Sequence, residues 1–570
     1  MDRSFSRALV AGCERVAAWA DLLDEINVFP VADGDTGRNL KISLGPLGRA
    51  NGRSSMLPKA LIRSATGNSG NIAAAFFSRF LAEAETGGMH TSVAAGREAA
   101  WHAVADPKPG TMLTMFDALV QATKKWPANV FRHDADGIVA HLDNAVRSTV
   151  ELLPELKRAG VVDAGALGMF IFFEGFFCRL ESETTEMVPV TERFAGLLDV
   201  TGDIVGGQFP GYCVNTIIRS VDSAKLGPKT ADLGESVVAV ADDGCLRLHL
   251  HTHNQQATRS RLETLGDIVD WQVEPMDDRG GLPFPKNDGK SVHVMTDAAG
   301  SITREEARTL GITLLDSQLV VDDSSVPESL FDARQMYGAM SDGRRVSTAQ
   351  ASVFQTHQSY QSALGRYENV LYLTVGSVYT GNFATASQWR EKRGMADRFT
   401  VMDTGAASGR LGLITRMVAR FAWSGKPLKV VAAFARQAID GCDELIFLDQ
   451  LKFLAAGGRI SKSKGFFGDL LGIKPVIRPA ADGAAKVGTV RKTPDQLPFA
   501  LGYLKQRFSP GDRLTILLQF SDNETRVREA IGPEIQLQFP MAAITVSRLS
   551  LTAGAHMGPG TWGIAFCPEL

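Results

Sequence analysis

The sequence predicts a protein of several domains: an all-α helical N-terminal region, a small α+β middle region and a C-terminal, two-lobed α/β region. Three observations support this fold class. The chain has 570 residues, which is too long for one hydrophobic core. Apolar residues recur at helical spacing through roughly the first third of the chain, and short strand-like runs become common after about residue 205.

The composition is that of an ordinary folded protein, with 44% hydrophobic and 22% charged residues. A formal net charge of -3 argues against a nucleic-acid partner, because such proteins usually carry a basic surface. The six cysteines are scattered without a CxxC pair, as is typical of a reducing compartment. The N-terminus does not resemble a signal peptide. We therefore expect a cytoplasmic protein.

The N-terminal region, predicted as a domain over residues 1–195, shows helical periodicity from its start. One apolar helix face is formed by Leu9, Cys13, Val16, Ala20 and Leu23. A second face, with Ile72, Phe76, Phe80 and Leu81, follows the segment "GNSG". Few alternating patterns occur here, so the region is predicted to contain helices alone.

The middle region, predicted over residues 196–273, contains the segment "ESVVAVADDGCLRLHLHTHN". Two alternating runs flank Asp243 and Gly244, a pair that favours a hairpin turn. The following segment, "EPMDDRGGLPFPKNDGK" (274–290), is rich in Pro, Gly and Asp and is predicted to be an interdomain linker.

The C-terminal region, predicted over residues 291–570, alternates short apolar strands with helical patterns. Its predicted strands lie in "SVHVMTD", "NVLYLTVGS", "RFTVMDTG", "DELIFLD" and "RLTILLQF". Strands that alternate with helices indicate an α/β domain with a largely parallel sheet. Ligands bind beyond the C-terminal ends of such strands, where Asp297, Ser377, Thr380 and Asp403 follow.

The segment "NVFPVADGDTGRNL" (27–40) places Asp33 and Asp35 on either side of a glycine. Alone, this pattern favours a tight turn with a solvated acidic tip. However, two other small-residue turns precede helical runs, in "TGNSGN" (66–71) and "VVDAGALG" (161–168), and "KPGTMLT" (108–114) is a further polar turn. Glycine-rich helix starts favour phosphate, and Mg²⁺ prefers carboxylate and phosphate oxygens. The combination indicates a Mg-nucleotide site.

These four motifs together resemble the nucleotide-binding domain of the dihydroxyacetone kinase (DhaL) family, closest to the branch found in bacterial fatty acid kinase. The resemblance implies an antiparallel helical barrel that binds ATP and two Mg²⁺ ions at one end. It implies that Asp33 and Asp35 bind Mg²⁺ and take part in catalysis. The implied nucleotide contacts are Asn39, Asn68, Ser69, Gly70, Thr111, Asp163 and Gly165.

The N-terminal motifs also depart from the family pattern. Dihydroxyacetone kinases carry another aspartate five residues before the pair, where this chain has Val28, with Asn27 beside it. The fatty acid kinase branch shares that difference. Arg38 and Thr66 also differ from the residues expected in that branch, which bears on the details of phosphate contact.

The segment "CLRLHLHTHN" places His249, His251 and His253 on one face of a predicted strand. A polar solvent face is the plain interpretation. Histidines two residues apart on a strand can also share a tetrahedral zinc, and Cys213 lies in another strand-like stretch. The pattern resembles the middle domain of fatty acid kinase, which implies Cys213, His249 and His251 as zinc ligands.

The C-terminal segments "GGRISKSKGFFGDLLGIKPVI" and "GAHMGPGTWGIAF" resemble the DegV family, the fatty acid-binding component of bacterial fatty acid kinase. The resemblance implies a fatty acid in an apolar tunnel. Its carboxylate would be bound by Thr348, Ser377, Thr380, Arg459 and His556. Arg459 and His556 would also stabilise charge during transfer. Ala298 and Ala349 stand where the family usually has serine.

The two resemblances together predict a single-chain fatty acid kinase, which converts ATP and a fatty acid into an acyl phosphate and ADP. We expect a homodimer that makes peripheral membrane contact for lipid exchange. Three alternatives stay open. The first is a small-polyol kinase with glycerone kinase activity. The second is a non-enzymatic lipid carrier, and the third is a regulatory scaffold with degenerate sites.

Overall fold

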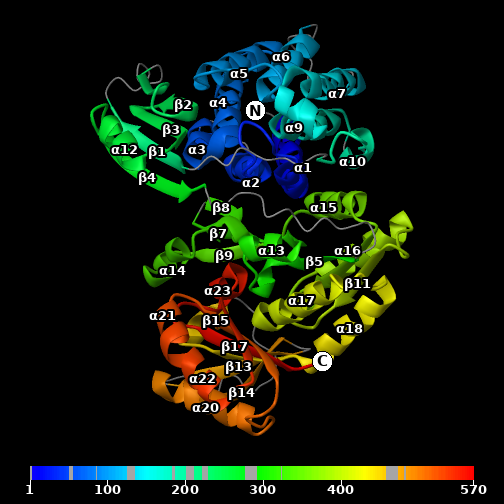
Figure 1. The fold of residues 1–570 in the computed structure, drawn as a ribbon, viewed down its shortest axis with the longest axis vertical. Helices are drawn as coiled ribbons and strands as arrows, with labels where there is room; N and C mark the ends of the chain where they lie inside the picture. Colours follow the sequence, from blue (N-terminus) through cyan, green and yellow to red (C-terminus); the bar gives the residue numbers. More distant parts are fainter. Residues whose placement is uncertain are drawn as a thin grey trace. The chain divides into compact units, whose positions relative to one another are not determined.

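The computed structural model describes residues 3–49, 56–84, 87–124, 135–182, 187–200, 211–220, 229–276, 292–322, 324–456, 473–480 and 483–570. The chain divides into two compact units (Figure 1). Unit 1 comprises Met1–Pro283 and Phe354–Gly365, and unit 2 comprises Phe284–Val353 and Arg366–Leu570. The predicted N-terminal and middle domains thus form one unit, and most of the predicted linker (277–290) lies outside the described residues.

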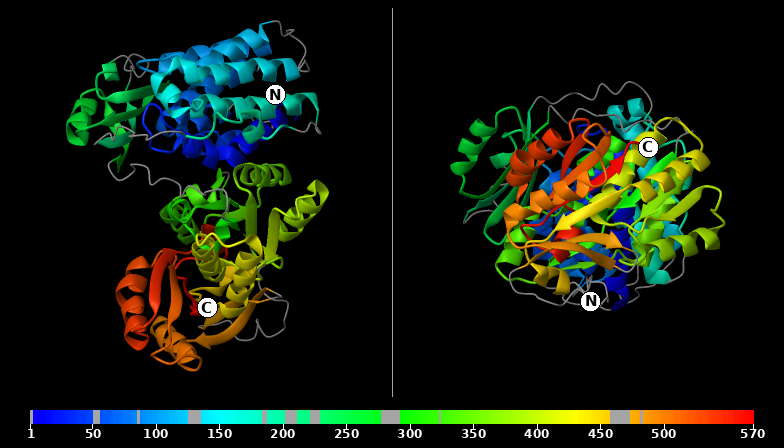
Figure 2. Two further views of the ribbon diagram at one scale, coloured as in Figure 1. Left: turned by 45° about the vertical axis from the view of Figure 1, so that its right-hand side comes forward. Right: turned by 90° about the horizontal axis from the view of Figure 1, so that it is seen from below.

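Unit 1 begins with helices, as the sequence predicts. They are α1 (Arg3–Glu25), α2 (Thr36–Ser43), α3 (Leu57–Ser64), α4 (Gly67–Glu83), α5 (Met89–Ala103), α6 (Met112–Thr123), α7 (Ala135–Leu152), α8 (Pro154–Ala159), α9 (Ala164–Glu181) and α10 (Val190–Arg193). A short 3₁₀ turn, η1 (Gly45–Arg49), follows α2. The left view of Figure 2 shows the long helices side by side, with their axes close to a common direction.

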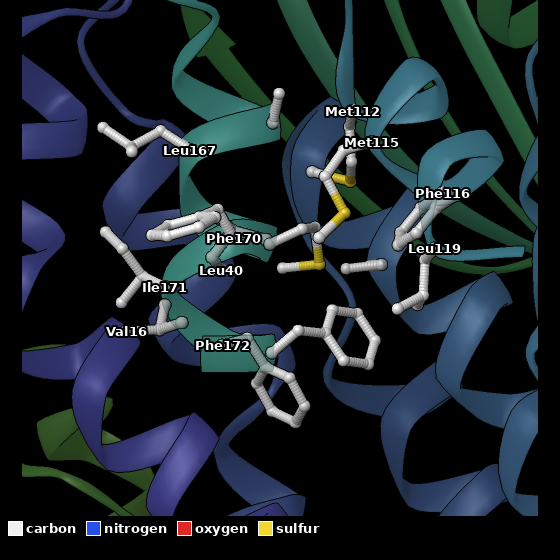
Figure 3. Close-up of a cluster of buried hydrophobic side chains, with 14 of the residues drawn as sticks. Val16, Leu40, Met112, Met115, Phe116, Leu119, Leu167, Phe170, Ile171 and Phe172 are labelled. Atoms are coloured by element: carbon white, nitrogen blue, oxygen red, sulfur yellow. The ribbon is translucent and has the colours of Figure 1, made fainter. Parts of the chain in front are cut away.

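Helix α9 lies at the centre of this helical domain, because its residues are buried on all sides rather than along one stripe. It packs closely on α1: a Cβ at Gly12 would lie 2.7 Å from the Phe172 carbonyl oxygen. Phenylalanines from α4, α6 and α9 fill the core, and the Phe76 and Phe116 rings stack with centroids 4.1 Å apart. Figure 3 shows this core around Leu40, Met112 and Phe170.

The middle domain is a four-stranded antiparallel sheet with the order β2-β3-β1-β4. Its elements are β1 (Tyr212–Arg219), β2 (Glu235–Asp242), β3 (Cys245–Thr252), α12 (Gln255–Glu263) and β4 (Asp267–Pro275). The predicted hairpin is confirmed. Asp243 and Gly244 both have positive φ, 43° and 77°, as a type I′ turn requires.

The middle domain is packed directly on the helical domain within unit 1. An antiparallel bridge joins Val104 to Val238, and an apolar cluster combines Ile62 and Ala75 with Val240. The sheet therefore lies against α3, α4 and α5, and it is held there by both backbone hydrogen bonding and hydrophobic burial.

Unit 2 contains a parallel sheet with the strand order β11-β10-β5-β6. Its strands are β5 (Val292–Asp297), β6 (Ile312–Leu315), β10 (Asn369–Thr374) and β11 (Phe399–Asp403). Associated helices are α13 (Arg304–Leu310), α16 (Asn382–Arg393), α17 (Ser408–Ala422) and α18 (Leu428–Gly441). Three of the five predicted strands lie here, and the expected parallel arrangement is correct for them.

The other two predicted strands correct the expectation of one largely parallel sheet. β12 (Asp443–Phe447) and β15 (Leu514–Phe520) flank β17 (Trp562–Pro568) in a six-stranded sheet, and both run antiparallel to it. The sheet is completed by β13 (Lys474–Ala480), β14 (Gly483–Val490) and β16 (Ala543–Arg548). The last strand inserts between two earlier ones, a long-range pairing that local patterns do not encode.

A small antiparallel sheet, with the order β8-β7-β9, completes unit 2. Its strands are β7 (Gln318–Val321), β8 (Ser324–Pro327) and β9 (Val346–Ala349), and η5 (Glu328–Leu330) follows β8. The remaining helices of unit 2 include α14 (Ala333–Ser341), α19 (Leu451–Ala456), α20 (Gln496–Lys505), α21 (Glu524–Arg526), α22 (Gly532–Gln538) and α23 (Leu551–Met557). Helix α15 (Val353–Arg366) belongs to unit 1 except at its two ends. Among the described residues, no helix combines the length and apolar character that a bilayer crossing requires.

Candidate functional site

The acidic loop between α1 and α2 is held by the side chain of Asn27, which is 6% exposed. Its amide Nδ2 donates to Asp33 Oδ1 at 2.8 Å and to the Val31 carbonyl oxygen at 3.2 Å. Its Oδ1 accepts from Thr36 Oγ1 at 2.6 Å. The amide next to the Val28 position therefore fixes one of the two predicted metal-binding carboxylates. A carboxylate at Asn27 would lack the donor that Asp33 receives here.

Asp35 occupies the position before the first turn of α2, but its side chain makes no capping hydrogen bond to that helix. It instead accepts from Asn39 Nδ2, one turn later, at 2.7 Å. Gly37 lets this turn approach α1 closely, because a Cβ there would lie 1.9 Å from the Ala20 carbonyl oxygen. The loop geometry thus depends on backbone contact between α2 and α1.

The predicted turn "TGNSGN" forms the start of α4 and packs against α2. A Cβ at Gly67, which has φ +63°, would lie 1.9 Å from Asn39 Nδ2, and one at Gly70 would lie 2.1 Å from Ser43 Oγ. Ser69 Oγ donates to the Thr36 carbonyl oxygen at 3.4 Å. The structure therefore brings Asn39, Ser69 and Gly70 together beside Asp35.

The other predicted nucleotide residues form a second pair of helix starts. Thr111 precedes α6 and Asp163 precedes α9; each side chain accepts a backbone hydrogen bond from its own helix. Burial raises the pKa of Asp163 to about 7, although hydrogen bonds from Ala166, Gly165 and Met112 lower it. Asp163 therefore connects the starts of α6 and α9, and its contacts are those of a buried cap.

The two pairs of helix starts are neighbours. A Cβ at Gly168 of α9 would lie 2.4 Å from Leu40 Cδ1 of α2. Helices α2 and α9 therefore pack against each other one turn after their starts, and helix N-termini favour anions. Asn68 Oδ1, in the first turn of α4, is buried and has no hydrogen-bond partner among the described residues.

These residues fit a Mg-nucleotide. Asp33 and Asp35 offer carboxylate oxygens whose orientation is fixed by amide donors, which suits a hard cation. In the described part of the chain, they are not joined by a third acidic or histidine side chain at metal-ligand spacing. Two carboxylates leave positions for phosphate oxygens and water, the usual environment of nucleotide-bound Mg²⁺.

The middle domain contains a buried cluster of Cys213, His249 and His251, which are 5%, 2% and 1% exposed. Their ligand atoms lie within 4.8 Å of one another, and this is the only such cluster found among the described residues. Strand pairing explains the cluster, since Cys213 on β1 lies opposite His251 on β3. His253 is exposed and outside the cluster, as expected.

The cluster fits a zinc ion, because it combines one thiol with two imidazoles. Burial and the charge of His251 hold the pKa of His249 well below its usual value, so its ring is neutral. His249 Nε2 is buried without a hydrogen-bond partner in the described part of the chain. A neutral, buried imidazole with an unpaired nitrogen is a suitable metal ligand.

Asn215 links this cluster to the turn at Gly67. It lies opposite His249 in the β1/β3 pairing, and its Oδ1 is 3.0 Å from His249 Nδ1. The same Oδ1 accepts from the Gly67 backbone N–H at 3.3 Å. Sequence reasoning missed Asn215, although its spacing of two from Cys213 placed it on the same strand face.

The predicted fatty acid head-group residues are divided among three segments of unit 2. Thr348 on β9 and His556 on α23 meet, with Oγ1 3.2 Å from Nε2. Ser377 and Thr380 lie after β10, where the Ser377 N–H donates to Asp403 Oδ1 and Thr380 Oγ1 accepts from the Asn382 N–H. Arg459 lies outside the described residues.

Asp297, at the C-terminal end of β5, makes structural contacts instead of facing solvent. It accepts from Tyr372 Oη, the Val375 N–H and Asn382 Nδ2 at 2.7–2.8 Å. Burial raises its pKa to about 6 despite these hydrogen bonds. Its neighbour Ala298 is 2% exposed.

Glu328 is a second residue that the sequence did not reveal. It follows β8, is 3% exposed, and accepts hydrogen bonds from the Thr552 N–H, at 3.2 Å, and from Thr552 Oγ1. It thereby holds the first turn of α23, the helix that carries His556. A lone glutamate in "VPESLF" gives no sequence signal of this role, because its partner is more than two hundred residues away.

Three family models match the chain. A model described as the DAK2 domain matches residues 30–178, and one for the middle domain of FakA-like fatty acid kinase proteins matches residues 209–280. A model for the DegV family of uncharacterised proteins matches residues 291–569. The matches follow the order of the helical, middle and C-terminal regions.

Curated relatives resemble part of the chain. Protein YloV of Bacillus subtilis is 26% identical over 317 residues, which are 48% of this chain and 55% of that protein. An uncharacterised protein of Staphylococcus epidermidis is 28% identical over 313 residues, or 48% of this chain and 54% of that protein. The chain therefore spans about half the length of these relatives.

Solved DegV structures resemble the other part. A fatty acid-binding DegV family protein from Thermus thermophilus matches with a TM-score of 0.46 and 22% identity, covering 49% of this chain and 100% of that one. DegV of Bacillus subtilis, a fatty acid binding protein, matches with a TM-score of 0.45 and 20% identity, covering 49% and 99%. From the three family models, the chain joins a DAK2 domain, a FakA-like middle domain and a DegV-family domain, which matches the architecture of a fused fatty acid kinase.

Proposed function

We propose that the chain is a single-chain fatty acid kinase, which transfers the γ-phosphoryl group of ATP to the carboxylate of a fatty acid. The observation that carries this proposal is the presence of all three domains in one polypeptide. A DAK2 domain supplies a phosphoryl donor site, and a DegV-family domain supplies a lipid site for the acceptor.

The donor site comprises the acidic loop and the four helix starts of unit 1. Backbone N–H groups at the starts of α2, α4, α6 and α9 would contact the phosphates. Asp33 and Asp35 would hold Mg²⁺, which neutralises phosphate charge when bound. Asn27 and Asn39 would keep the two carboxylates in position. The nucleotide then arrives at a site whose side chains are already oriented.

The acceptor site comprises Thr348 and His556 of unit 2, with Arg459, Ser377 and Thr380 as further predicted contacts. A carboxylate oxygen attacks the γ-phosphorus while the bond from that phosphorus to the β–γ bridging oxygen breaks, and ADP leaves. Because a carboxylate is already ionised at neutral pH, no general base is needed. Hydrogen-bond donors around the carboxylate would position it and stabilise the developing charge.

A hydroxylamine trap tests this proposal. Purified protein is mixed with Mg-ATP and a long-chain fatty acid, and acyl phosphate is captured as acyl hydroxamate. Hydroxamate that requires both substrates is the expected result. ATP consumption with dihydroxyacetone alone would instead identify a polyol kinase. Lipid retained by the protein without any turnover would identify a carrier or a regulatory protein.

The middle-domain cluster is proposed to hold zinc through Cys213, His249 and His251. All three ligands are buried and come from paired strands, and three protein ligands leave the fourth position of a tetrahedral zinc open. Metal analysis of the purified protein tests this proposal. About one zinc per chain is expected, and its loss in the Cys213→Ser variant would assign the site.

A further inference from the structure

We propose that Asn215 couples the Cys213–His249–His251 cluster to the nucleotide-binding turn of α4, so that an occupied cluster supports nucleotide binding. The inference rests on the proposed function, since it needs a nucleotide at the start of α4 and a metal ion in the cluster. Asn215 belongs to neither set of predicted ligands. It is a positioning residue, and the geometry around its amide oxygen supports this role.

One oxygen atom of Asn215 serves both sites. Oδ1 lies 3.0 Å from His249 Nδ1 and accepts from the Gly67 N–H at 3.3 Å. On its other side, Asn215 Nδ2 lies 3.8 Å from Cys213 Sγ. The amide therefore presents its oxygen to a histidine and to a backbone N–H, and its nitrogen to a thiol. This orientation satisfies all three groups at once.

The orientation of the amide depends on the tautomer of His249. Nδ1 must carry the proton to donate to Asn215, which leaves the lone pair on Nε2, the buried nitrogen without a partner among the described residues. A cation held by Nε2 would fix this tautomer, and the hydrogen bond from Nδ1 to Asn215 would support it. Without a cation, the proton is free to move to Nε2, and Nδ1 becomes an acceptor.

That proton shift would change the hydrogen-bond partner of the Gly67 backbone N–H. With Nδ1 as an acceptor, the Asn215 amide is better satisfied when it flips and presents Nδ2 to the ring. The same flip places the amide nitrogen opposite the Gly67 N–H, which would lose its acceptor. An unsatisfied, partly buried N–H group is unfavourable, and the turn would lose its preferred position.

The turn at Gly67 continues directly into the predicted Mg²⁺ site. A Cβ on Gly67 would lie 1.9 Å from Asn39 Nδ2, the amide that donates to Asp35 Oδ1 at 2.7 Å. A continuous series of contacts therefore joins His249, Asn215, Gly67, Asn39 and Asp35 within unit 1. Each link is a hydrogen bond or a close contact, so displacement of the turn reaches the carboxylate.

The test measures binding of Mg-ATP, without fatty acid, by calorimetry. Zinc-loaded and zinc-stripped forms of the full chain are compared for the wild type and for Asn215→Ala. Because one hydrogen bond is lost, we expect the zinc-stripped wild type to bind Mg-ATP about three- to tenfold more weakly than the zinc-loaded wild type. The same loss of affinity for Mg-ATP is expected in zinc-loaded Asn215→Ala. Removal of zinc should then have little further effect on the affinity of that variant.

Two further variants separate coupling from a general structural effect. Gln272, exposed on β4 opposite Asn215, is the matched control, and Gln272→Ala should behave as the wild type. Asn215→Asp keeps an oxygen for both hydrogen bonds and has no N–H group to present after a flip, so zinc removal should have little effect on the affinity of this variant for Mg-ATP. Co²⁺ substituted into the cluster should give the same absorption spectrum in Asn215→Ala and the wild type.

Three results would overturn the coupling. In the first, zinc-loaded Asn215→Ala binds Mg-ATP as tightly as the wild type does. In the second, zinc removal weakens Mg-ATP binding equally in the variant and in the wild type. In the third, the cluster takes up no metal. If stripped protein loses its circular dichroism spectrum, the zinc-loaded comparison alone decides. Failure of the zinc-loaded wild type to bind Mg-ATP would instead overturn the proposed function, which distinguishes the two proposals.

Discussion

At the scale of single residues, Asp33 and Asp35 are oriented by neighbouring amides before any ligand arrives. Asn27 and Asn39 each donate to one carboxylate oxygen, at 2.8 and 2.7 Å. A donor on one oxygen restricts rotation of the carboxylate and reduces the entropy that must be lost when a cation binds. This arrangement predicts that both charge and geometry matter at these positions.

The substitution Asp35→Asn removes a negative charge while the side chain keeps nearly the same shape. We expect it to reduce ATP-dependent acyl hydroxamate formation by at least about a hundredfold, because transition-state charge stabilisation of this kind is worth several kcal/mol. Fatty acid binding, measured by lipid co-purification, should be unchanged. Asp106→Asn, at an exposed aspartate of unit 1, is the control. Retained turnover in Asp35→Asn would remove Asp35 from the metal site.

Glu328 predicts a pH dependence in the helix that carries His556. Burial raises its pKa to about 7 from an ordinary value of 4.5, so the packed state binds the proton more tightly than the opened state. The resulting stabilisation of α23 is complete below about pH 4.5 and is lost as the pH rises through about 7. The loss should be on the order of 1–3 kcal/mol.

Hydrogen exchange measured peptide by peptide checks this prediction. The free energy of opening for the peptide that covers α23 should fall from pH 5 to pH 8 in the wild type. Glu328→Gln, which resembles the protonated side chain, should show little change over the same range. Glu391→Gln, at an exposed position on α16, serves as the control. A wild-type profile as flat as that of Glu328→Gln would contradict the assigned role.

At the scale of secondary-structure elements, the acidic loop is positioned by the contact between α1 and α2. Gly37 has no side chain at a point where a Cβ would lie 1.9 Å from the Ala20 carbonyl oxygen. The neighbouring backbone atoms cannot move aside in the way that a flexible side chain can. Gly37 is therefore required by the packing of α2 against α1, and not only because it belongs to the acidic-loop motif.

The substitution Gly37→Ala should push α2 away from α1. Overpacking of this kind usually lowers stability by about 1–3 kcal/mol, and thermal unfolding of the full chain measures the effect. Mg-ATP binding should weaken as well, because Asp35 and Asn39 move with α2. Gly45→Ala, where a Cβ would meet nothing within 4 Å, should change neither property. Equal behaviour of the two variants would show that the α1–α2 contact does not set the loop position.

Several elements could be predicted because their signals are local. Apolar periodicity marked α1, and the Asp243–Gly244 pair marked the β2–β3 hairpin. The sheet that contains β12 and β15 was predicted wrongly, since β17 inserts between them from the end of the chain. Asn215 and Glu328 were missed for a related reason: their roles depend on partners that are distant in sequence, such as Gly67 and Thr552.

At the scale of the whole molecule, the proposed function combines two activities that each need the other. A phosphoryl donor site without an acceptor hydrolyses or retains ATP, and a lipid site without a donor only stores fatty acid. A covalent connection raises the effective concentration of one module near the other, on the order of millimolar for a flexible link. The domain set therefore predicts that fatty acid and ATP are consumed together in equal amounts.

The most direct test is the stoichiometry of ADP and acyl hydroxamate in one reaction, with the wild type, Asp35→Asn and His556→Ala compared. The proposed function predicts one hydroxamate for each ADP in the wild type. In Asp35→Asn, it predicts that both products are lost while fatty acid still binds. In His556→Ala, it predicts a raised KM for fatty acid while ATP binding is preserved. ADP formed without hydroxamate, or wild-type turnover in both variants, would contradict the central claim that the chain phosphorylates a fatty acid.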